Sequence, residues 1–119
     1  MNKALLAVGA IDGAIAVAAG AFGAHALKDR LTDKALAVFE TGARYQMYHA
    51  LAIVLCALIA GGVAGARVSG WMFQAGIVLF SGSLYALALT DIKVLGAITP
   101  LGGLAFIAGW IWLAISALR

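Results

Sequence analysis

Four long apolar stretches, separated by short polar connections, dominate the chain. They cover Ala4–Leu27, Tyr45–Gly65, Val68–Leu89 and Pro100–Leu118. Each is close to the ~20 residues that a helix needs to cross a ~30 Å hydrocarbon core. Lipid offers the backbone no hydrogen-bond partners, so segments that span it are expected to be α-helices. Because the connections are short, the pattern predicts an all-α, up-down four-helix membrane bundle, a single domain over residues 1–119.

The first connection has the pattern of a short amphipathic helix, predicted at Thr32–Thr41. Val38 and Phe39 would form its apolar side, opposite a charged stripe that ends in Glu40 and Arg44 at favourable i,i+4 spacing. We expect this helix to lie in the membrane interface and the chain to bend at Gly42 into the second span.

Capping signals mark the starts of three helices. Thr32 is the expected N-cap of the interfacial helix, with a hydrophobic staple between Leu31 and Leu36. Ser69 is the expected cap of the third span. Thr99, followed by proline, is the expected cap of the fourth.

Composition excludes an ordinary soluble domain. Hydrophobic residues make up 65% of the chain and charged residues 11%, against roughly 45–50% and 25% in soluble domains. The eight Lys and Arg residues are dispersed and form no basic stripe, so we expect no nucleic-acid partner. Cys56 is the single cysteine, which rules out an intrachain disulfide and the paired-cysteine metal spacings.

The distribution of Lys and Arg predicts the orientation. Five lie in or beside the first and third connections (Lys28, Arg30, Lys34, Arg44 and Lys93), and three lie at the other face (Lys3, Arg67 and Arg119). The positive-inside rule then places these two connections in the cytoplasm and both termini outside.

The N-terminal stretch resembles a secretory signal but is interpreted as the first span, because it is long enough to cross a bilayer and Asp12 interrupts its apolar run. Gly9 and Gly13 form a GxxxG pair, and Gly61 and Gly65 form another. Such pairs allow close helix contact, either within one monomer or between copies in a homo-oligomer.

Polar residues of all four spans converge on the membrane face that holds the first and third connections. The candidate site is His25, Lys28, Glu40, Arg44, Tyr45, Tyr48, His49, Asp91 and Thr99. On the second span, Tyr45, Tyr48 and His49 share one stripe by their i,i+3,i+4 spacing. We expect His49 to reach His25 or Thr99, and Arg44 to pair with Glu40.

Three interpretations of this polar face remain open. In the structural one, the tyrosines form an interfacial belt and the histidines hydrogen-bond between helices. In the second, Arg44, Lys28 and the imidazoles bind an anion such as a lipid phosphate. In the third, His25 and His49 bind metal with Asp91 or Glu40, although the sequence has none of the usual metal-ligand spacings.

Asp12 lies about two turns into the first span, where a charge costs at least ~2.5–3.5 kcal/mol. Antiparallel counting places Gln74 and either Trp110 or Trp112 at a similar depth. A protonated Asp12 that hydrogen-bonds to Gln74 is the favoured interpretation, with a proton-linked transport role as the alternative.

No GxSxG, Walker or HExxH motif occurs in the sequence. The sequence therefore favours a non-enzymatic membrane module without a cofactor, which binds lipid headgroups or serves as an accessory subunit of a larger membrane assembly. The alternative is an oligomeric transporter or channel for small solutes or protons.

Four motifs carry a resemblance to a known family: "GAFGAHAL", "FETGARYQMYHAL", "GIVLFSGSLYAL" and "ITPLGGLAFIAGWIWL". Together they resemble the domain-of-unknown-function family four-two-three, small four-span bacterial inner-membrane proteins with an animal transmembrane relative. The resemblance covers essentially the whole chain. It implies four helices and a membrane location, and it implies no particular activity.

Overall fold

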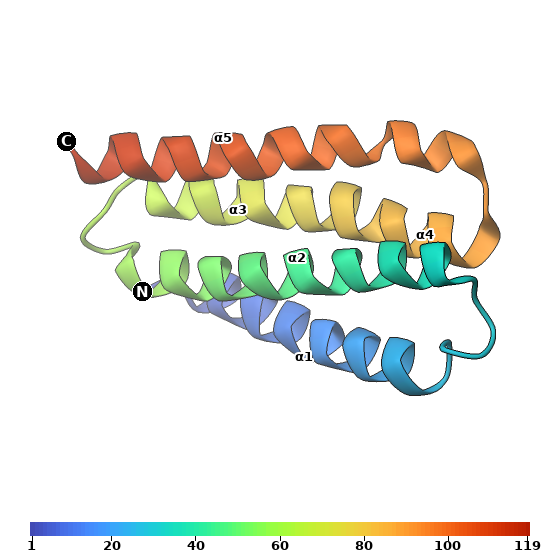
Figure 1. The fold of residues 1–119 in the computed structure, drawn as a ribbon. Coiled ribbons are helices and arrows are strands. Elements are labelled where there is room, and N and C mark those ends of the chain that lie inside the picture. Colours follow the sequence, from blue (N-terminus) through green and yellow to red (C-terminus); the bar gives the residue numbers. More distant parts are fainter.

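The computed structural model describes all 119 residues as four antiparallel helical spans (Figure 1). The first two spans are α1 (Lys3–His25) and α2 (Asp33–Ile59). The third is built from α3 (Ala66–Gly76), the π-helical turn η1 (Ile77–Ser81) and α4 (Gly82–Thr90). A 3₁₀ turn, η2 (Lys93–Ala97), leads into α5 (Thr99–Ala117). The predicted all-α fold with four helices apolar enough to span a membrane is confirmed.

α2 and the third span form the centre of the molecule. α1 packs mainly against α2, and α5 packs mainly against the third span, so α1 and α5 lie at opposite edges (Figure 1). One end of the molecule, here called the basic end, holds the α1–α2 connection and η2. The other, here called the terminal end, holds both termini and the α2–α3 connection.

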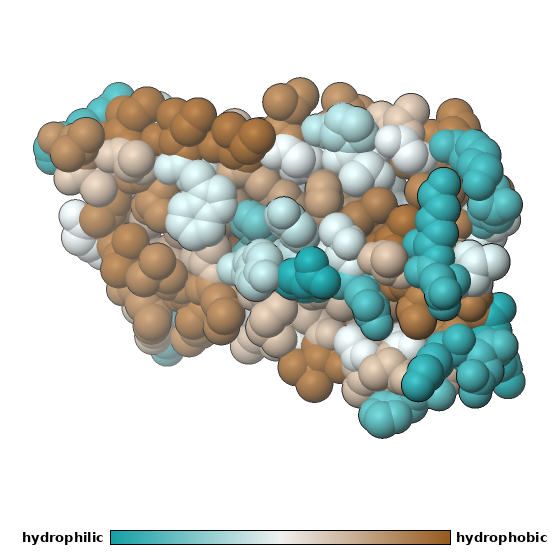
Figure 2. Space-filling model, viewed as in Figure 1, coloured by the Kyte–Doolittle hydropathy of each residue, from teal (hydrophilic) through white to brown (hydrophobic).

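The outer surface of the helices is apolar. Exposed leucines follow one stripe of α2 at Leu51, Leu55 and Leu58, and α5 exposes Leu101 and Leu104 in the same way. Figure 2 shows hydrophobic surface along the helices and a concentration of hydrophilic surface at the basic end. Such a surface is stable in lipid and would aggregate in water, which agrees with the membrane setting.

The predicted interfacial helix is part of α2. Helical backbone begins at Asp33 and continues to Ile59, with no bend at Gly42. The expected apolar side is present, because Phe39 is buried and Val38 is half-buried. Gly42 lets the Tyr85 ring and the Ser81 backbone approach, since a Cβ there would lie 3.0 Å from Tyr85 Cε1 and 3.3 Å from Ser81 O. The glycine therefore serves close packing between α2 and the third span, and helical backbone continues through it.

Glycines and phenylalanines interlock along the contact between the third span and α5. A Cβ at Gly76 would strike the Phe106 ring, and a Cβ at Gly109 would lie 2.6 Å from Phe73 Cε1. At Gly102 the obstacle is the backbone of Phe80. Each aromatic ring thus fills the space left by a glycine on the facing helix, the close approach by which helices associate in lipid.

The helix caps match the predictions in part. Thr32 Oγ1 accepts a hydrogen bond from the Ala35 N–H over 3.1 Å, as predicted. Leu31 and Leu36 both pack on the small core cluster around Leu27 and Phe39. Two predictions were wrong: the third span begins at Ala66, three residues before Ser69, and Ile98, not Thr99, is the N-cap of α5.

Candidate functional site

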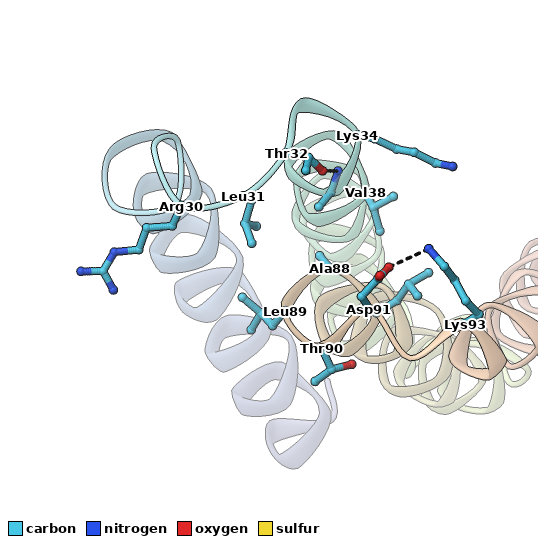
Figure 3. Close-up of a pocket in the computed structure, with 12 residues that line it drawn as sticks. Arg30, Leu31, Thr32, Lys34, Val38, Ala88, Leu89, Thr90, Asp91 and Lys93 are labelled. Atoms are coloured by element: carbon cyan, nitrogen blue, oxygen red, sulfur yellow. Dashed lines mark hydrogen bonds and ion pairs between the residues drawn. The ribbon is translucent and has the colours of Figure 1, made fainter.

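A cleft of about 580 Å³ opens at the basic end, between the α1–α2 connection and the last turns of α4 (Figure 3). Half of its lining is apolar, with leucines and a valine from both sides (Leu31, Val38, Leu87 and Leu89). Its rim carries three cationic residues (Arg30, Lys34 and Lys93). The cleft thus combines an apolar wall, continuous with the membrane-spanning helices, with a basic rim.

One of the three rim cations is already paired. Lys93 Nζ donates to Asp91 Oδ1 over 2.7 Å, the only ion pair of the chain. This hydrogen bond, with the charge of Lys93, lowers the pKa of the Asp91 carboxyl. Arg30 and Lys34 have no carboxylate partner, and their side chains extend away from the apolar wall (Figure 3). Two unpaired positive charges therefore face the surroundings at the rim.

The N-terminus of α2 adds to the positive character of this cleft. Thr32, the N-cap, lines the cleft, and Ala35 one turn later does so as well. The first N–H groups of a helix lack intrahelical partners and the helix dipole is positive there, which favours an anion. The geometry is thus suited to a phosphate group at the rim with hydrocarbon beside it.

His49, a predicted site residue, links α2 to α5 and lies far from both expected partners. Its Nε2 accepts a hydrogen bond from Trp110 Nε1 over 3.0 Å, and its Nδ1 lies 2.8 Å from the Tyr45 carbonyl oxygen. The imidazole stacks on Phe106 with ring centroids 3.6 Å apart and planes 9° apart. Contact with His25 or Thr99 is therefore a wrong prediction, because His49 lies about four turns beyond the start of α2, deep in the bundle.

A second set of hydrogen bonds joins α1, α2 and the third span. Gln46 Nε2 donates to the Asp12 carbonyl oxygen over 2.9 Å, and Tyr85 donates its hydroxyl hydrogen to Gln46 Oε1 over 2.8 Å. Ser81 donates to the Gly42 carbonyl oxygen over 2.7 Å. All three bonds lie on the side of α2 that faces its helical neighbours, so they help to hold the bundle together.

Thr99 and Asp91 fall into different surroundings. The Thr99 hydroxyl lies 2.6 Å from Ser83 Oγ, which ties the start of α5 to α4. Asp91 ends α4 in a left-handed conformation, with φ of 57°, and lines the basic cleft. Of the predicted site residues, only Asp91 belongs to that cleft.

The other predicted site residues lie on the outside of the helices. His25, Lys28, Glu40 and Arg44 are exposed, and Glu40 and Arg44 form no ion pair, contrary to prediction. Tyr45 and Tyr48 are also exposed, and their rings meet edge to face with centroids 5.6 Å apart.

The metal-binding interpretation is not supported by the geometry. His25 is exposed at the end of α1, whereas both nitrogens of His49 are engaged within the bundle. No three His, Cys, Asp or Glu side chains come together. The predicted polar face thus consists of three separate parts. These are the exposed polar residues of α2, the buried His49 with its hydrogen bonds to Trp110 and Tyr45, and the basic cleft.

Sequence reasoning used Arg30, Lys34 and Lys93 only as indicators of orientation and did not connect them into a site. Their signal was their position, since all three flank the turns at one membrane face. It also overlooked Gln46, the one amide side chain of the second span, which the structure places at the centre of a hydrogen-bond network.

Together, the fold and this site define a small helical integral membrane protein with a basic-rimmed cleft at one end. The chain belongs to the family described as "Protein of unknown function (DUF423)", whose model matches residues 19–103. It is 49% identical to the UPF0382 membrane protein YwdK of Bacillus subtilis (strain 168), over 98% of each chain. It is 48% identical to the UPF0382 membrane protein SH2409 of Staphylococcus haemolyticus, over 98% of this chain and 97% of the relative. No solved structure matches.

Proposed function

We propose that this protein is a non-enzymatic membrane module that binds anionic phospholipid headgroups in the cleft at its basic end. The observation that carries this proposal is the pair of unpaired cations, Arg30 and Lys34, on the rim of a cleft whose wall is apolar. A lipid phosphate would meet the cations and the N-terminus of α2, while the first part of its acyl chains would lie against Leu31 and Val38.

The location of the cleft supports this proposal. The rim lies where spans α1 and α4 end, and the ends of membrane spans are where lipid headgroups are expected. If the positive-inside rule holds for this chain, the cleft faces the cytoplasmic leaflet, where anionic lipids attract basic residues by about 1 kcal/mol each. The same rule supports an orientation with both termini outside, and the bacterial membrane-protein relatives support a bacterial inner membrane as the location.

Native mass spectrometry of the purified protein tests the proposal through retained lipid. The double variant Arg30→Ala/Lys34→Ala should retain less phosphatidylglycerol than the wild-type protein at equal detergent concentration, while its retention of phosphatidylethanolamine should change little. The matched control is Lys3→Ala/Arg67→Ala, which removes two positive charges at the terminal end. Equal losses in both double variants would show that the cleft is not the site.

The buried carboxyl-bearing residue Asp12, which is 6% exposed, supports a second candidate: a proton-linked transporter that would need several copies to enclose a path. Proton flux into liposomes that is abolished by Asp12→Asn would favour this candidate. Flux that equals that of empty liposomes would exclude it.

The native mass spectra used to measure lipid retention also report the number of copies and any partner subunit. They therefore test the homo-oligomer and accessory-subunit hypotheses.

A further inference from the structure

A carboxyl group and an amide group meet inside the membrane-spanning part of the molecule. Asp12 lies on α1, about 14 Å along the helix from its first residue at a rise of 1.5 Å per residue. Its side chain faces Gln74 of α3, the helix that lies parallel to α1. Both residues thus lie about two turns or more inside their helical spans.

Each of the two groups has an oxygen atom without a partner. Asp12 Oδ2 and Gln74 Oε1 are both buried, and neither takes part in a hydrogen bond. An ionised carboxylate has only acceptors, and an amide oxygen is an acceptor too. As long as Asp12 is ionised, these two oxygens cannot satisfy each other, and each unsatisfied group costs free energy in a medium without water.

No cation compensates a charge on Asp12. The Gln46 side chain of α2 is neutral and donates to the Asp12 backbone carbonyl oxygen. Tyr85 of α4 is engaged with Gln46, and Cys56 lies in the apolar core beside Leu5. The His49 ring is bonded to Trp110, toward α5. The charged groups Lys3 and Arg67 are exposed at the terminal end, and His25 is exposed at the other end of α1.

We propose that Asp12 and Gln74 form an intramembrane binding site for one proton, held as a cyclic acid–amide pair. The proton resides on Asp12 Oδ2 and is donated to Gln74 Oε1. The Gln74 Nε2 group donates in return to the second carboxyl oxygen. Two hydrogen bonds then provide partners for both oxygens that lack one, Asp12 Oδ2 and Gln74 Oε1, without a net charge in the hydrocarbon.

The pair would be the main polar contact between α1 and the third span. α1 otherwise meets α3 through apolar groups, as where Leu5 fills the space beside Gly70. Loss of the proton would leave an uncompensated charge between α1 and α3. Protonation of Asp12 is therefore coupled to the packing of α1 against α3.

Infrared spectroscopy of the protein in lipid at pH 7 tests this proposal directly. A protonated carboxyl gives a C=O stretching band distinct from the carboxylate bands, and it shifts to lower wavenumber in D₂O. We expect one such band, lost in Asp12→Asn, which keeps the shape of the side chain. Asp91→Asn is the matched control, because Asp91 is exposed and ion-paired, and this substitution should leave the band in place.

Gln74→Leu distinguishes an acid–amide pair from an isolated protonated acid. Removal of the amide should move the band to higher wavenumber, because the carboxyl loses its hydrogen-bond partner. Absence of the band from the wild-type protein at pH 7 would overturn the proposal. A band that Gln74→Leu leaves unmoved would overturn the pairing with Gln74.

Discussion

Trp110 determines which nitrogen of His49 carries the proton. An indole N–H can only donate, and Trp110 Nε1 lies 3.0 Å from His49 Nε2, so Nε2 is the acceptor. The hydrogen of a neutral imidazole must then be on Nδ1, where it is donated to the Tyr45 carbonyl oxygen over 2.8 Å. Both nitrogens are occupied, so His49 acts here as a neutral link between α2 and α5.

Trp110→Phe should lower the free energy of unfolding by about 0.6 kcal/mol and at most ~1.7 kcal/mol, the range for hydrogen bonds between helices in lipid. The phenyl ring retains much of the contact with Phe73, whose ring centroid lies 4.7 Å from that of Trp110. Reversible unfolding in detergent micelles measures the change. The ¹⁵N spectrum of His49 should show a protonated Nδ1 in the wild-type protein.

Trp112→Phe is the control for this substitution. Trp112 Nε1 is buried but has no hydrogen-bond partner, so its removal should cost less than the removal of the Trp110 indole. Equal destabilisation by the two variants would contradict the assigned bond between Trp110 and His49.

Gly102→Ala should destabilise the protein by about 1–3 kcal/mol or prevent folding, as expected for overpacking. A methyl group there would collide with the backbone of Phe80, which cannot move aside as a flexible side chain would. Gly103→Ala is the neighbouring control, since its methyl group would lie 4.0 Å from Phe80 Cδ2. That variant should be neutral or gain up to ~1 kcal/mol from helix propensity. Comparable thermal stability of both variants would contradict the close contact between Gly102 of α5 and the backbone of Phe80.

Tyr85→Phe and Gln46→Met should show coupled effects on stability. Tyr85 orients the Gln46 amide, whose other end bonds to α1, so each substitution weakens a shared network. A double-mutant cycle in detergent should give a coupling of about 0.6 kcal/mol and no more than ~1.7 kcal/mol. Tyr45→Phe removes an exposed hydroxyl and serves as the control. Additive effects of Tyr85→Phe and Gln46→Met would show that the two side chains do not interact.

Single cysteines introduced into a Cys56→Ala background should report the orientation. Lys28→Cys lies at the basic end and Gly62→Cys at the terminal end, and both positions are exposed. The positive-inside rule predicts that a membrane-impermeant maleimide labels Gly62→Cys in intact cells and labels Lys28→Cys only after permeabilisation. The reverse pattern would place the basic cleft outside and remove the argument from cytoplasmic anionic lipids.

The candidate site could be predicted only in part. The first turn of α2 could be predicted, because a threonine flanked by a hydrophobic staple (Leu31 and Leu36) is a local signal. Thr32 caps the helix as expected. The hydrogen-bond partner of His49 could not be predicted from residue spacing. Antiparallel counting suggested Thr99 because it assumed that the second span begins at Tyr45, whereas α2 begins at Asp33. An error of three turns in one helix start displaced every cross-helix partner assigned from it.

The amino-acid sequence by itself determined the four spans, the helical class and the concentration of charge at one end. These depend on hydropathy, on the length that a bilayer requires and on the rule that a backbone in lipid must bond to itself. Only the tertiary structure decided which side chains meet, such as Trp110 with His49 and Tyr85 with Gln46. The physical reason is that lipid scarcely distinguishes one apolar face of a helix from another. Rotation and register therefore follow from glycine–aromatic packing between helices far apart in the chain, which no local pattern encodes.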